Sequence, residues 1–213
     1  MKVVVSGASS GLGLSIVRYL LKEHHQVIGF GRRKEVSINH DNFTYYSLDF
    51  TKSCNFECKE TAIDAIVYCS AQFKSKQIEE HSIVDIENMI SVNLTGAIKF
   101  VRYFKSKMKD SGNIILISSV SGLRGQPLQS VYSATKHGLQ GFADALNHEV
   151  SQKITTICPG GINTPLWNDS NPYMGNVDKL LSPDKIASII NSVIVTSDII
   201  YKNITIYPEN ERH

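Results

Sequence analysis

The sequence predicts an α/β fold in which a parallel β-sheet is covered by helices on both faces. Three observations support this prediction. Short β-branched runs alternate with helix-like segments along the 213 residues, as in repeated strand–helix–strand units. Several of these runs are almost continuously apolar, which is typical of strands buried on both faces. A glycine-rich turn at 7–13 joins the first run to the first helical segment, as the nucleotide-binding motif requires.

The expected strands are short segments rich in β-branched and aromatic residues. The first follows Met1 directly, and the run Asn-Ile-Ile-Leu-Ile-Ser at 113–118 is nearly continuous in apolar side chains. The sequence places strands at 2–6, 26–30, 44–48, 65–69, 113–118, 153–158 and 204–207.

The expected helices show apolar residues at helical spacing. Such a stripe runs through 12–23, and Ser182 followed by Pro183 is a favourable N-cap and first position for a helix. Helices are expected at 12–23, 83–108, 132–150 and 183–195. The polar stretch 167–181 between the last two strands is either a mobile lid or a surface loop.

Composition favours one globular domain over 1–213, with 42% hydrophobic and 20% charged residues. A net charge of +2 is too small to indicate a nucleic-acid or membrane partner. No apolar run is long enough to span a membrane, and the apolar start is too short for a secretory signal, so we expect a cytoplasmic protein. The four cysteines, Cys54 among them, lack zinc-site spacing, so we expect free thiols and no metal.

The glycine turn predicts a site for a nucleotide cofactor. Gly7, Gly11 and Gly13 follow a strand and open a helix, where glycines allow a tight turn and close approach of the backbone to phosphate. The helix N-terminus then offers N–H groups and a positive dipole to a pyrophosphate.

Two arginines indicate which dinucleotide this is. Arg32 and Arg33 follow the second strand, where an acidic residue usually receives the ribose hydroxyls of NAD and a basic residue accommodates a 2′-phosphate. We therefore expect NADP(H) rather than NAD(H), although Arg-Arg-Lys runs are often only solvated surface charge. Asp49, after the third strand, is either a contact of the adenine amino group or a loop residue.

A Tyr-x-x-x-Lys pair supplies the expected chemistry. Tyr132 and Lys136 share one face of a helix, and Ser119 lies thirteen residues upstream. A nearby cation lowers the pKa of a phenol, so Lys136 is expected to prepare Tyr132 for proton exchange with a carbonyl or alcohol.

These motifs, taken in order, resemble the classical short-chain dehydrogenases/reductases over nearly the whole chain. The matching segments are Gly-Ala-Ser-Ser-Gly-Leu-Gly at 7–13, Asn93, Ile-Ser-Ser-Val-Ser-Gly at 117–122, Tyr-Ser-Ala-Thr-Lys at 132–136 and Pro-Gly-Gly-Ile-Asn-Thr-Pro at 159–165. The resemblance implies a Rossmann-like, doubly wound sheet of about seven strands. It also implies a homodimer or tetramer built on the helices at 83–108 and 132–150, and we favour the dimer.

The resemblance implies a role for each catalytic residue. Ser119 would polarise the substrate carbonyl, and Tyr132 would exchange the proton with its oxygen. Lys136 would lower the pKa of Tyr132 and hold the nicotinamide ribose. Asn93 would interrupt its helix and hold a water that relays protons from Lys136.

The expected cofactor contacts combine the glycine turn, the arginines and the family motifs. Thr164 would contact the nicotinamide carboxamide, and Ile162 would pack near the nicotinamide. The full set is Gly7, Ser9, Ser10, Gly11, Leu12, Gly13, Arg32, Arg33, Asp49, Ser70, Ala71, Tyr132, Lys136, Pro159, Gly160, Ile162 and Thr164.

One departure from the family pattern follows the fourth strand. The chain has Cys69-Ser70-Ala71-Gln72 where the family often has Asn-Asn-Ala-Gly, so local geometry or cofactor affinity is expected to differ. Trp167, in a substrate loop at about 166–182, either packs on substrate or pins the loop.

We therefore expect an NADPH-dependent reductase of a small carbonyl compound. The alternatives are an NAD-linked alcohol dehydrogenase and a non-catalytic sensor or scaffold that binds NADP(H).

Overall fold

The computed structural model describes residues 1–52, 55–168, 171–173 and 175–209. Its centre is a seven-stranded sheet in the order β3-β2-β1-β4-β5-β6-β7, with every neighbouring pair parallel. The strands are β1 (Lys2–Ser6), β2 (Gln26–Gly31), β3 (Phe43–Ser47), β4 (Ile63–Tyr68), β5 (Met108–Ile117), β6 (Lys153–Pro159) and β7 (Asn203–Ile206).

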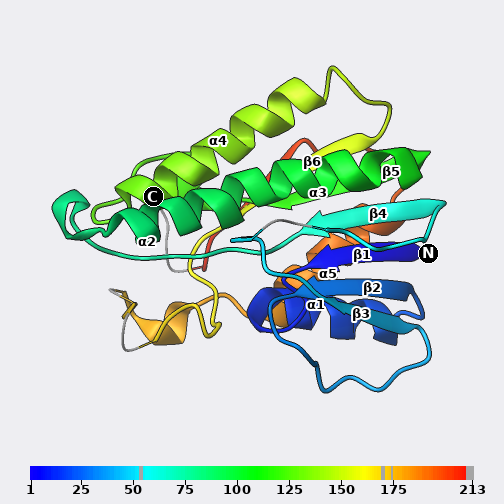
Figure 1. The fold of residues 1–213 in the computed structure, drawn as a ribbon, viewed down its shortest axis with the longest axis horizontal. Helices are drawn as coiled ribbons and strands as arrows, with labels where there is room; N and C mark the ends of the chain where they lie inside the picture. The colour runs from blue at the N-terminus through cyan, green and yellow to red at the C-terminus, as the bar shows by residue number, and fades with distance from the viewer. Residues whose placement is uncertain (53–54, 169–170, 174, 210–213) are drawn as a thin grey trace.

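Helices cover both faces of this sheet (Figure 1). On one face α1 (Gly11–Lys22) and α5 (Pro183–Val195) pack together over a cluster that includes Val3, Val5 and Ile157. On the other face α3 (Gly96–Phe104) and α4 (Ser130–Leu146) enclose a second cluster, and α2 (Ile83–Ile90) precedes α3. The predicted Rossmann-like α/β fold is confirmed. None of the helices in the described ranges is both long and apolar enough to cross a membrane.

The helix predicted over 83–108 is wrong at its C-terminal end and interrupted in its middle. A π-helix, Ser91–Thr95, separates α2 from α3, and a 3₁₀ turn at Lys105–Lys107 closes α3. Met108 is the first residue of β5, paired with Ile63. The strand starts five residues earlier than predicted because the polar run at 109–112 hides it from a pattern based on apolar residues.

The last turn predicted for the helix at 132–150 is also wrong. The helix α4 begins at Ser130 and ends at Leu146, the last residue buried on its apolar face. The helix predicted at 183–195 is confirmed, with Pro183 in its first turn, although Ser182 makes no capping bond through its side chain.

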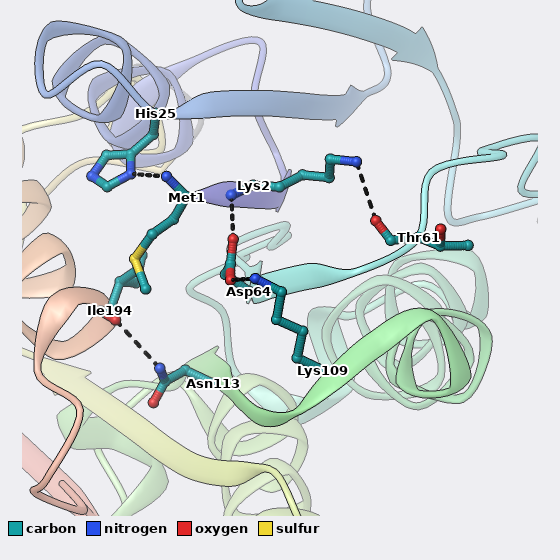
Figure 2. A network of polar contacts seen from close by, with 8 residues as sticks. All are labelled: Met1, Lys2, His25, Thr61, Asp64, Lys109, Asn113 and Ile194. Atoms are coloured by element: carbon teal, nitrogen blue, oxygen red, sulfur yellow. Dashed lines mark hydrogen bonds and ion pairs between the residues drawn. The ribbon is translucent and has the colours of Figure 1, made fainter.

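Polar contacts tie together the amino ends of the central strands (Figure 2). The predicted motifs lie at the opposite, carboxyl ends of the strands. The Asp64 carboxylate accepts from the backbone N–H of Lys2 and from Lys109 Nζ, both at 2.6 Å. His25 contacts the N-terminal amine through Nδ1 at 3.2 Å and Asn191 of α5 through Nε2 at 3.0 Å. These contacts link β1, β4, β5 and α5 at the amino ends of the strands.

Candidate active site

A cavity of about 730 Å³ opens at the carboxyl ends of the strands, where doubly wound sheets bind ligands. Every residue predicted to contact the cofactor lines it except Lys136, and Ser119 lines it as well. Lys136 and Asn93 are buried and lie outside the lining. The topology therefore brings together residues as far apart in the chain as Gly7 and Thr164.

The glycine turn is held by contacts that leave no room for a side chain. Gly7 has a φ of 72°, and a Cβ on Gly13 would lie 2.2 Å from the carbonyl oxygen of Gly7. The start of α1 is therefore packed closely against the turn, the role that the third glycine has in dinucleotide-binding turns. Ser10 precedes the helix in an extended conformation and makes no side-chain capping bond.

The two arginines follow β2 at the cavity rim. The Tyr45 hydroxyl donates to the backbone oxygen of Arg33 at 2.7 Å, which fixes the path of the chain there. Asp49 accepts from the backbone N–H and the hydroxyl of Thr51 at 3.0 and 2.8 Å. Burial acts to raise the pKa of Asp49, but the bonds from Thr51 and the charge of Arg32 lower it overall. Asp49 therefore caps its own loop while lining the cavity.

The hydroxyls of Ser119 and Tyr132 meet in the cavity. Ser119 follows β5, Tyr132 lies in the first turn of α4, and the Ser119 hydroxyl lies near enough to the Tyr132 hydroxyl to act on its pKa. Ser119 Oγ also accepts from the backbone N–H of Ser121 at 3.1 Å. Both side chains are buried, so the pair is preorganised to meet one oxygen atom of a ligand.

The predicted lowering of the Tyr132 pKa is wrong for this structure. Burial raises the pKa of Tyr132 to about 12, and the nearby Ser119 hydroxyl offsets this only in part. Burial also lowers the pKa of Lys136 to about 8. Its ammonium donates to the carbonyl oxygen of Ile117 at 2.8 Å and lies 5.6 Å from the Tyr132 ring centroid, so loss of solvent outweighs its charge.

The departure at Cys69–Gln72 leaves the segment well held. The backbone N–H groups of Cys69 and Ser70 both donate to Ser6 Oγ, at 3.0 and 3.1 Å. Asn93 accepts from the backbone N–H of Gln72 at 2.7 Å and donates to its carbonyl at 2.9 Å. Side chains of Ser6 and Asn93 therefore bind the backbone of this segment, and the expected difference from the family in geometry or cofactor affinity stays a prediction.

The thiols in the described ranges are free, and Cys54 lies outside those ranges. Cys69 lines the cavity, and burial raises the pKa of its thiol to about 12. It is therefore a neutral group at neutral pH rather than a nucleophile.

Several residues that were not predicted from the sequence also line the cavity. Their only signal in the sequence is a position a few residues after Ala71 or Ser119, in connections between elements. They include Gln72, Phe73, Ser121, Arg124, Gln126 and Gln129.

The chain matches the short chain dehydrogenase family over residues 1–174. It belongs to that family. This short-chain dehydrogenase/reductase is 27% identical over 224 residues to an uncharacterized oxidoreductase of Staphylococcus aureus strain MW2, with 96% of each chain covered. Membership identifies it as an NAD(P)-dependent oxidoreductase that acts on CH–OH groups.

Solved structures share the fold of this short-chain dehydrogenase/reductase. An alcohol dehydrogenase from the archaeon Thermococcus sibiricus, complexed with 5-hydroxy-NADP, has a TM-score of 0.83 at 20% identity and covers 100% of this chain and 98% of its own. A 4-hydroxyisoleucine dehydrogenase complexed with NADH has a TM-score of 0.82 at 23% identity, with 97% of each chain covered.

Proposed function

We propose that this protein is an NADPH-dependent reductase that converts a carbonyl group to an alcohol. The observation that carries the proposal is the pair of buried, neighbouring hydroxyls on Ser119 and Tyr132 in the cavity wall. Two hydroxyl donors that meet at one point can stabilise the negative charge that develops on a single carbonyl oxygen.

The protonation states of Tyr132 and Lys136 support the reduction of a carbonyl group. With its pKa raised to about 12, the Tyr132 phenol is protonated at neutral pH and can donate its proton to the nascent alkoxide. Lys136 lies about one-tenth of a helix turn past a full turn from Tyr132. It keeps its positive charge at neutral pH, because its pKa of about 8 is higher than 7. Asn93, whose side chain is engaged by Gln72 and Thr135, would serve the proton relay through its backbone carbonyl.

The residues present fit a dinucleotide. The turn closed by the contact of Gly13 with Gly7 would form the cradle for a pyrophosphate. Thr164 lies over Gly11, with its Cβ 3.2 Å from where a Cβ on Gly11 would be. Arg32 and Arg33 would hold a 2′-phosphate, which favours NADPH. When bound, NADPH supplies the hydride that reduces the carbonyl carbon.

The remaining expectations belong to the same proposal. The chain would form one domain over 1–213, with the loop at 166–182 bordering the substrate, and would work in the cytoplasm as a homodimer. The dimer would be built on the α2–α3 and α4 helices, and the partner molecules would be small carbonyl compounds and their alcohols.

An NAD-linked alcohol dehydrogenase is the second candidate, because one structure with this fold was solved with NADH. The test is NADPH and NADH oxidation with a panel of aldehydes, ketones, quinones and β-keto esters, run beside Tyr132→Phe. Turnover that prefers NADPH and disappears in Tyr132→Phe is the expected result. Substantial turnover without the Tyr132 hydroxyl refutes the assigned role, and tight NADPH binding without any turnover favours a non-catalytic binder.

A further inference from the structure

Three aromatic rings extend from the Tyr132 ring along the cavity. Phe73 meets Tyr132 edge-on with ring centroids 4.9 Å apart, Trp167 meets Phe73 at 5.0 Å, and Tyr173 meets Trp167 at 4.8 Å. All of them line the cavity, and we call Phe73, Trp167 and Tyr173 the aromatic wall. The wall therefore starts at the ring that carries the proposed proton donor.

The aromatic wall is held in place by the chain around it. Trp167 Nε1 donates to the carbonyl oxygen of Ile162 at 2.9 Å, which anchors the indole to the connection after β6. The Tyr173 ring lies against Gly161, where a Cβ would fall 2.9 Å from Tyr173 Cε2. Phe73 is only 5% exposed. Trp167 therefore pins its loop and also lines the cavity, and its predicted contact with substrate stays a prediction.

The wall carries no formal charge. The charged residues among the described lining are Arg32, Arg33 and Asp49, which follow β2 and β3 at the adenosine end, and Arg124, on the connection after Ser119. A group that reaches the wall meets aromatic faces and edges, which bind apolar and aromatic groups better than ionised ones.

We propose that the substrate is a ketone or aldehyde bearing an apolar ring, and that Trp167 and Tyr173 determine this specificity. The inference rests on the proposed function. If the carbonyl oxygen binds to Ser119 and Tyr132, the carbonyl carbon lies beside Phe73. A substituent on that carbon then lies along the aromatic wall.

The test compares three methyl ketones with similar intrinsic reactivity: benzylacetone, which carries a phenyl ring, butanone, which lacks one, and levulinate, which carries a carboxylate. In the wild-type protein with NADPH, we expect kcat/KM for benzylacetone to exceed that for butanone by about a hundredfold, as burial of one phenyl ring predicts. The kcat/KM for levulinate tests the alternative that Arg124 gives the site a preference for substrates with a carboxylate.

Two variants test whether the preference for benzylacetone comes from the aromatic wall. Trp167→Leu and Tyr173→Leu should each lower the ratio of benzylacetone to butanone by about tenfold, mainly through KM, because each removes ring contacts while keeping an apolar side chain. Both kcat/KM values in the ratio come from the same variant, so a partial loss of folded protein lowers both equally and leaves the ratio unchanged. Tyr103→Leu is the matched control: Tyr103 stacks on Phe56 with ring centroids 4.8 Å apart, outside the cavity lining, and the ratio should not change.

Equilibrium binding provides a readout that needs no turnover. Trp167 is the only tryptophan, so quenching of protein fluorescence by benzylacetone in the presence of NADP⁺ reports on the wall itself. Preferential binding of benzylacetone over butanone that weakens in Tyr173→Leu supports the inference, even if no carbonyl is reduced and the proposed function fails. Turnover that depends on Tyr132 but shows no benzylacetone preference, or a preference for levulinate, overturns the inference and leaves the reductase intact.

Discussion

The close contact between Gly13 and Gly7 in the proposed cofactor cradle can be tested by adding one methyl group at Gly13. In Gly13→Ala, the new Cβ would lie 2.2 Å from the oxygen and 2.6 Å from the carbon of the Gly7 carbonyl, both backbone atoms. Since an ordinary contact needs more than 3.4 Å, the turn and the start of α1 must move apart by about 1 Å.

Two opposing terms decide the sign of the effect on stability. Overpacking of this kind costs about 1–3 kcal/mol, whereas alanine is favoured over glycine in a helix by about 1 kcal/mol. The clash outweighs the gain, so we expect the free energy of unfolding to fall by up to about 2 kcal/mol. We expect the Kd for NADPH to rise by about tenfold or more, because the N–H groups that would face the pyrophosphate are displaced.

Gly141→Ala in α4 is the control, because a Cβ there would meet no atom within 4 Å. It should raise the free energy of unfolding by up to about 1 kcal/mol and leave NADPH binding unchanged. Urea unfolding and titration calorimetry measure the two quantities. If Gly13→Ala behaved like Gly141→Ala in both assays, the close-contact argument for the cradle would be wrong.

Three further predictions address coenzyme choice, proton transfer and pH. Replacing Arg32 and Arg33 together by alanine should weaken NADPH binding by about tenfold or more and leave NADH binding within about twofold, and an unchanged ratio of the two Kd values would remove the arginines from the 2′-phosphate site. Tyr132→Phe should lower kcat by at least about a hundredfold with little change in the Kd for NADPH, and equal losses in both would indicate a structural role instead. Burial and the N-terminal amine lower the pKa of His25 below 6.5, so the folded protein binds fewer protons there than the unfolded chain and loses stability as the pH falls through about 6.5. His25→Gln should flatten this loss in urea unfolding at a series of pH values, and an unchanged slope would assign the loss to other groups.

The sheet could be predicted from the sequence because its strands are short apolar runs separated by clear turns. The glycine turn, Ser119 and Tyr132 could be placed because each follows or precedes a recognisable element. The start of β5 at Met108 could not be predicted, because the strand continues through a charged stretch, Lys109-Asp110-Ser111-Gly112. This stretch is paired with β4 at both ends. Pairing with a neighbouring strand is a tertiary effect that local pattern does not contain.

The electrostatics of the site also lay beyond the sequence. The spacing of Tyr132 and Lys136 indicates proximity correctly, but the sign of the pKa shift depends on burial, which the surrounding elements determine. Likewise, the bonds from Ser6 and Asn93 that hold the segment at 69–72 join residues 21 to 64 positions apart. The aromatic wall was missed because Phe73 and Trp167 meet only when two connections fold over the same strand ends.

The π-helix at Ser91–Thr95 sets the rotational phase between α2 and α3. One residue advances an α-helix by about 100°, so the wider turn rotates the two helices relative to each other compared with a continuous helix. Folding the same residues as a regular α-helix would turn one of the flanking segments by about that angle. Either Asn93 would leave Gln72, or the buried face of α3 with Phe100 and Phe104 would rotate out of the core. The length of this turn therefore couples the packing of a core helix to the backbone that lines the cavity.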